Sequence, residues 1–106
     1  MMGTGWYPED KPTGFAFEQL TVSNAVKALT VGTYAPASGT QAQRAIFTNE
    51  TNDLRYRYDG TDPTAAIGHL LKAGDPLVIE GPQNIAQFRA IRAGAADATL
   101  NVTYER

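Results

Sequence analysis

The stretch Leu54-Arg55-Tyr56-Arg57-Tyr58 alternates residue by residue between apolar or aromatic side chains and arginines. Successive side chains of a β-strand point to opposite faces, so the leucine and the two tyrosines would share one face. Strict alternation of this kind is typical of a strand that is buried on one side. The same pattern returns near the end of the chain, where Leu100, Val102 and Tyr104 alternate with polar residues. The sequence therefore predicts a protein built from strands.

Shorter apolar runs around these two segments extend the prediction to the rest of the chain. Strands are expected around residues 15–22 and at 26–31, 43–48, 54–58, 77–80, 86–91 and 98–104. Glycines and Asp-Gly or Asp-Pro pairs fall between them, where turns are needed. About seven short strands separated by such turns indicate an all-β fold, a small β-sandwich or barrel. Its core is expected to contain Phe88, Ile91, Leu100 and Val102.

Three connections carry more specific expectations. Asn49–Asp53 separates two predicted strands and is expected to form a hairpin turn. Asp62 precedes a proline, an order typical of the N-cap and first position of a helix, so a short helical turn is expected at 62–66. His69 lies in a loop-like Gly-His-Leu-Leu setting, where a structural role is expected, such as a hydrogen bond that braces the loop.

Length and composition limit the classes of protein that the chain can belong to. The 106 residues suffice for one domain and not for two. The net charge of -2 argues against a nucleic-acid-binding surface, which normally carries a basic excess. The absence of cysteine excludes disulfides and Cys-based metal sites. No stretch approaches the roughly 20 apolar residues of a membrane span, so no membrane partner is expected.

The first fourteen residues, MMGTGWYPEDKPTG, differ from the rest of the sequence. They contain three glycines, two prolines and the only tryptophan, and they could not form a core by themselves. Residues 1–14 are therefore expected to form a flexible N-terminal arm that precedes a single β-sandwich domain at 15–106. Trp6 and Tyr7 are the candidate partner-binding residues of the arm, because tryptophan and tyrosine are enriched at interface hot spots. A disordered tail without a partner is the alternative.

The sequence offers few groups from which an active site could be assembled. There is one histidine, no cysteine and no Gly-x-Ser-x-Gly nucleophile motif, so we expect no enzymatic activity. Four acidic residues fall between Glu50 and Asp62, but they lack the spacing and the distant glutamate of a calcium loop. No metal and no cofactor are therefore expected.

Four arginines, Arg55, Arg57, Arg89 and Arg92, fall on predicted strands that could share one sheet. A solvated outer face accounts for this arrangement. The alternative is a charged contact face for an acidic partner, because arginine is favoured over lysine at interfaces.

The second half of the chain resembles a protein family. The run NDLRYRYDGTDPT at 52–64 leads into GHLL at 68–71 and continues through FRAIR at 88–92 to TLNVTY at 99–104. These segments are similar to a small protein encoded among the virion structural genes of tailed bacteriophages and prophages. The resemblance covers roughly the last half of the chain, and residues 1 to about 40 show no such likeness.

The resemblance implies a structural component of a virion. Small β-rich proteins of this kind commonly sit on the capsid as decoration or cement proteins, often as dimers or trimers. The expected partner is accordingly the major capsid protein or another virion protein, with homo-oligomerisation. The expected location is the capsid surface of the virion, after synthesis in the cytoplasm of the bacterial host.

Two other functions are compatible with the sequence. One is a module on a tail or head fibre that binds a carbohydrate or host receptor through exposed aromatic residues, with Trp6, Tyr7 and Tyr34 as candidates. The other is a head–tail or tail-tube component, which would assemble into rings.

Overall fold

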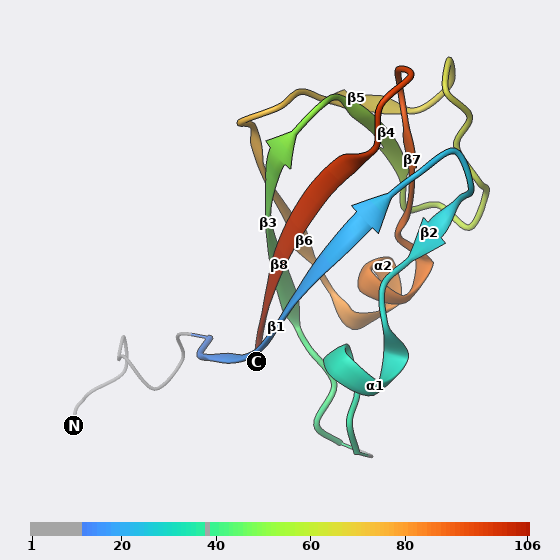
Figure 1. Cartoon of the computed structure of the whole chain (residues 1–106). Helices are drawn as coiled ribbons and strands as arrows, with labels where there is room; N and C mark the ends of the chain where they lie inside the picture. The colour runs from blue at the N-terminus through green and yellow to red at the C-terminus, as the bar shows by residue number, and fades with distance from the viewer. Residues whose placement is uncertain (1–11, 38) are drawn as a thin grey trace.

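The computed structural model of the protein describes residues 12–37 and 39–106, which form two antiparallel sheets packed face to face (Figure 1). We call the first the long sheet. Its strands, in spatial order, are β1 (Gly14–Val22), β8 (Ala98–Glu105), β3 (Arg44–Thr51) and β6 (Pro76–Glu80). The all-β fold that the sequence predicts is confirmed.

The second sheet, which we call the short sheet, contains shorter strands. Their order is β2 (Lys27–Ala28), β7 (Arg89–Arg92), β4 (Leu54–Arg57) and β5 (His69–Leu71). Two helices, α1 (Val31–Tyr34) and α2 (Pro82–Gln87), lie in connections between the sheets. The chain passes from one sheet to the other along most of its length, so most connections between consecutive strands join the two sheets.

The core lies between the two sheets and is formed by alternate residues of their strands. In β8, Leu100, Val102 and Tyr104 are fully buried while their neighbours are partly exposed, which confirms the predicted alternation. In the short sheet, Leu54 and Ala90 face the same interior. The stacked rings of Phe47, Phe88 and Tyr56 connect the long sheet to the short one, with centroid separations of 4.6 and 5.7 Å.

The strand predicted at 86–91 is confirmed for residues 89–91, which lie in β7, whereas residues 86 and 87 are the end of helix α2. Gly81, with φ of 97°, turns the chain, and Pro82 occupies the first turn of the helix, a position that suits its fixed φ. The helix ends at Gln87, and its C-cap residue Phe88 is fully buried in the core. Because β7 begins only at Arg89, Ala90 faces the interior and Ile91 is half-buried on the other side, so the placement of Ile91 in the core was wrong.

Asn49–Asp53 is a corner between the sheets, and the hairpin prediction was wrong. β3 pairs with β6 and β8, whereas β4 pairs with β5 and β7. Asn52 adopts a left-handed conformation with φ of 60°, which an asparagine tolerates. The buried Asn49 amide donates to the carbonyls of Asn52 and Leu71 at 2.6 and 3.0 Å and so holds the corner.

Two further expectations differ from the structure. The segment at 62–66 contains no helix; instead the Thr64 hydroxyl accepts hydrogen bonds from the backbone N–H groups of Ala66 and Ile67, which closes a tight turn. The strand predicted at 26–31 is reduced to the two residues of β2, after which α1 begins. At 62–66 the turn closed by Thr64 takes the place of the expected helix.

The start of the domain lies slightly earlier than the predicted boundary at residue 15. β1 begins at Gly14, and Thr13 exchanges two backbone hydrogen bonds with Arg106, at 2.9 and 3.0 Å. The guanidinium of Arg106 also lies over the ring of Phe15, 4.0 Å from its centroid. The first described residues are thus joined to the C-terminus at one end of the long sheet (Figure 1).

Candidate functional site

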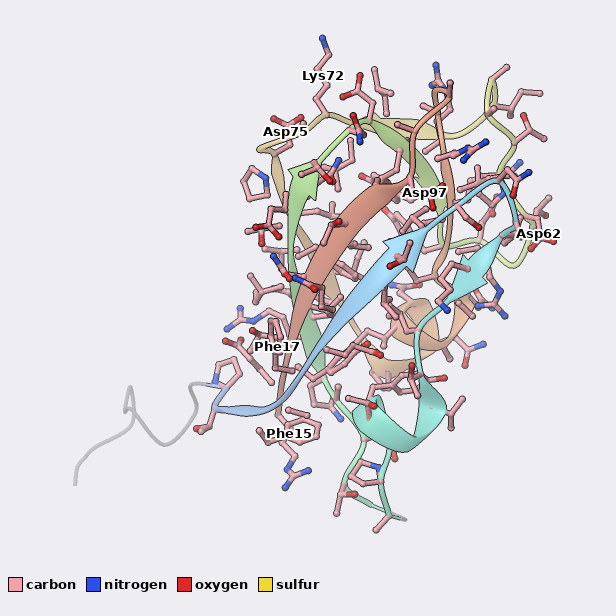
Figure 2. The ribbon with its side chains drawn as sticks, viewed as in Figure 1. Phe15, Phe17, Asp62, Lys72, Asp75 and Asp97 are labelled. Atoms are coloured by element: carbon pink, nitrogen blue, oxygen red, sulfur yellow. The ribbon has the colours of Figure 1, made fainter. Side chains whose placement is uncertain are left out.

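The outer face of the long sheet carries a row of four side chains, three of them apolar, that crosses all four strands. The pairing register places Phe17 opposite Thr103, Thr103 opposite Ile46, and Ile46 opposite Val78. Directly opposed residues project from the same face of a sheet, so these four side chains form one continuous row. Phe17 is 60% exposed and Val78 is 50% exposed, and Figure 2 labels Phe17 on β1. We call this set the apolar row.

A charged group borders the apolar row on one side. Arg44 lies between Glu105 and Glu80 in the register, and its guanidinium contacts their carboxylates at 2.8 and 3.3 Å. The hydrogen bond from Arg44 to Glu105 contributes most to raising the pKa of the arginine. The positive charge of Arg44 is therefore already paired with carboxylates of the same sheet.

Neutral polar side chains border the row on its other side. The amide of Gln19 donates to the Oδ1 atom of Asn101 at 2.9 Å, and Thr48 continues this band on β3, with Pro76 opposite it on β6. The Glu50 carboxylate lies at the end of the band and accepts hydrogen bonds from the amides of Gln19 and Asn101, each at 3.5 Å. The face is therefore a central apolar row between a paired-charge edge and an amide band. An exposed apolar strip rimmed by polar groups is typical of a surface that meets another protein.

The arginines singled out in the sequence do lie on two neighbouring strands, but they do not form one contact face. In the β4–β7 pairing Arg57 lies opposite Arg89, and Arg55 shares their side of the sheet. Arg92 lies opposite the fully buried Leu54 and so belongs to the other side. The expectation of one contact face that includes all four arginines was therefore wrong, because the strand register places Arg92 on the opposite face of the sheet from the other three.

All four guanidinium groups are engaged within the chain. Arg55 donates to the carbonyls of Ala65 and Gly68 at 3.1 and 3.0 Å, which fixes the loop between β4 and β5. The remaining three donate to nearby acceptors: Arg57 to Asp59, Arg89 to the carbonyls of Ala86 and Phe88, and Arg92 to Asp97. These contacts favour a structural role over recognition of an acidic partner.

His69 lies at the start of β5 and not in a loop. It is exposed, its ring packs against that of Tyr56 with a centroid separation of 5.2 Å, and its side chain forms no hydrogen bond with any described residue. The proposed bracing hydrogen bond is therefore missing from the part of the chain that the structure covers. The loop is held by Arg55 instead.

The other candidate aromatic residues of the sequence have different outcomes. Tyr34 is half-buried and packs against Tyr104 at a centroid separation of 6.0 Å, so it is no open platform for a ligand. Trp6 and Tyr7 lie outside the described residues. The described chain places the arm's point of attachment at Pro12 and Thr13, next to Arg106.

The buried Tyr104 forms a structural pair with Glu18. The hydroxyl of Tyr104 donates to the carboxylate of Glu18, which also accepts hydrogen bonds from the backbone N–H and the hydroxyl of Thr30. Burial, reinforced by Glu18, raises the pKa of Tyr104 far above its usual range. These contacts join β1, β8 and the start of α1, and they leave the phenol protonated at any physiological pH.

Two searches of the described residues bear on other classes of function. Residues 12–37 and 39–106 contain no group of three or more His, Cys, Asp or Glu side chains arranged to hold a metal ion. No helix within those residues has the length and apolar character needed to span a membrane.

The apolar row was not recognised in the sequence, although one signal was present. In β1, Phe17 is three residues from Leu20 and five residues from Val22, both of which are core residues. Only residues separated by an even number of positions share a face of a regular strand, so Phe17 must lie on the face opposite to the core. The remaining members of the row come from strands whose neighbours the sequence does not specify.

A search with protein-family models gave no match, and neither did searches of curated proteins and of solved structures.

Proposed function

We propose that the chain is a structural protein of a tailed-bacteriophage virion, a decoration or cement protein that docks on the lattice of the major capsid protein. The observation that carries the proposal is the apolar row on the outer face of the long sheet. Phe17, Ile46 and Val78 project from paired strands on that face, and Phe17 and Val78 are at least half exposed. Covering such side chains removes apolar surface from water, at about 25 cal/mol per Å².

The charges of this face suit a protein partner better than a nucleic acid. Arg44 is paired with both Glu80 and Glu105, so this group carries one net negative charge, and the Glu50 carboxylate lies against the amide band on the other side of the row. A phosphate backbone is bound chiefly by free lysines and arginines, and the described part of this face offers none. Paired charges and amides at the edge of an apolar strip form the polar rim that protein interfaces have.

The capsid setting comes from the resemblance of residues 52–64, 68–71, 88–92 and 99–104 to phage virion proteins. These segments form β4, β5, β7 and β8 and the loop after β4. The resemblance therefore covers one strand of the long sheet, β8, which contributes Thr103 to the row, and three strands of the short sheet. A lattice of identical sites would add to the strength of the attachment, because linked copies bind with an avidity above that of a single contact.

The arm is the second part of the proposal. The described chain begins at Pro12, beside the end of the long sheet, where Thr13 pairs with Arg106. We place Trp6 and Tyr7 in contact with a neighbouring copy or capsid subunit, in a dimer or trimer of the chain. Aromatic anchors of this kind contribute disproportionately to binding energy.

The test is the addition of purified protein to phage particles that lack it, followed by sedimentation. Wild-type protein should sediment with the particles and saturate, and protein that begins at Pro12 should bind about tenfold more weakly or worse, because it lacks the two aromatic anchors. Thermal unfolding of the truncated protein serves as the control and should match the wild type. Wild-type protein that remains in the supernatant would contradict the docking proposal, and full binding by the truncated protein would contradict the role of the arm.

A further inference from the structure

A hollow of about 420 Å³ opens where β4 and β5 meet α2, at one end of the sandwich. Its volume falls in the range of small-molecule binding sites. The lining combines two aromatic rings with four polar side chains: Arg57, Tyr58, Asp59, His69, Asn84 and Gln87. None of these residues belongs to the outer face of the long sheet, so protein docked through the apolar row would keep the hollow free.

The aromatic part of the lining is the exposed end of a stack of rings that begins in the core. Tyr58 and His69 both pack on Tyr56, with centroid separations of 6.4 and 5.2 Å, and Tyr56 packs on the fully buried Phe88. Burial raises the pKa of Tyr56, which keeps that ring neutral within the stack. Tyr58 remains 38% exposed and His69 is exposed as well. The stack thus presents preordered aromatic surface to solvent.

The polar part of the lining provides hydrogen-bonding groups of both kinds. The Arg57 guanidinium donates to both carboxylate oxygens of Asp59, at 3.1 and 2.6 Å, and these hydrogen bonds lower the pKa of that carboxyl. The Nδ2 atom of Asn84 donates to the Glu80 carbonyl at 3.0 Å, which leaves its Oδ1 atom as an acceptor. The side-chain amide of Gln87 forms no hydrogen bond with the described residues.

We propose that this hollow binds a neutral saccharide unit of a glycan. A sugar ring has an apolar face of C–H groups that can lie on Tyr58 or His69, and a rim of hydroxyls that both donate and accept hydrogen bonds. The amides of Asn84 and Gln87 and the Arg57–Asp59 pair supply the complementary donors and acceptors. A few polar groups around aromatic surface are the usual composition of a small-ligand site.

The charge of the site argues against an anionic ligand. Arg57 is held by Asp59 in a two-contact ion pair, so a phosphate or carboxylate would have to displace an existing carboxylate. A nucleotide could stack on the same rings, but its phosphate would find no free guanidinium in this lining. A neutral, hydroxyl-rich ligand meets neither obstacle.

The test is titration of the full chain, followed by NMR, with neutral sugars: glucose, galactose, mannose, N-acetylglucosamine and their β-linked dimers, to about 10 mM. At least one should shift the signals of Tyr58, His69 and Gln87. Tyr58→Ala should weaken this binding about tenfold or more, and Gln87→Ala should weaken it less. Tyr58→Phe keeps the ring and should retain most of the affinity.

Two matched variants control for effects on the fold. Gln83→Ala alters the same helix outside the hollow, and Phe17→Ala removes an exposed ring from the other sheet; both should bind as the wild type does. No shift with any of these sugars would overturn the proposal. So would binding that survives Tyr58→Ala, or shifts at these residues with adenosine monophosphate alone.

Discussion

Replacing Phe88 with alanine is expected to lower the free energy of unfolding by about 3–5 kcal/mol, the usual cost of removing a buried phenylalanine side chain. Phe88 is fully buried, and its ring stacks on Phe47 of the long sheet and on Tyr56 of the short sheet. Alanine would leave a cavity between the two sheets and remove the support of the aromatic stack. Small domains have only about 5–15 kcal/mol of stability, so the variant should be close to unfolding.

Urea denaturation followed by circular dichroism measures this change. Phe17→Ala is the matched control, because it makes the same substitution at a side chain that is 60% exposed and should change stability by no more than about 0.5 kcal/mol. The account of the core would be contradicted if the two variants lost equal stability.

The second large effect is expected on attachment to particles. The double substitution Phe17→Glu and Val78→Glu places two carboxylates in the apolar row, where docking through the row would remove them from water. An uncompensated buried charge costs about 3–5 kcal/mol, so binding should fall about a hundredfold or more. Both side chains are exposed in the free protein, and the fold should therefore be retained.

The control for this variant is Ile67→Glu. Ile67 is also 60% exposed, but it lies in the loop between β4 and β5, away from the long sheet. In the sedimentation assay Ile67→Glu should bind as the wild type does. If both variants lost binding equally, or if the double variant bound fully, the claim that the apolar row is the docking surface would be contradicted.

The alternating segments were the part of the fold that could be predicted from sequence. β8 is buried on one side along its whole length, and a period of two is the direct consequence of that burial. β4 is a strand as predicted, but only Leu54 is fully buried in it, and Tyr58 lies beyond its end and is exposed. Helix α2 escaped prediction because its six residues contain only one buried side chain, Ile85, and so show no helical period. The Gly81-Pro82 pair was the one local sign of its start.

Sequence patterns could not predict which strands pair with one another. Asn49–Asp53 has the composition of a hairpin turn, and only the pairing of β3 and β4 with different partners shows that it joins two sheets. Both proposed sites depend on such pairings. The apolar row needs the order β1-β8-β3-β6, and the hollow needs α2 beside the ends of β4 and β5.

The number of copies of the protein in purified phage particles, measured by quantitative mass spectrometry against the major capsid protein, tests the central claim most directly. A decoration protein should be present at a constant ratio, with many copies that follow the capsid lattice. The absence of the protein from purified particles would contradict the proposed function. A few copies per particle would contradict it as well, because that number is expected of a ring at the junction of head and tail.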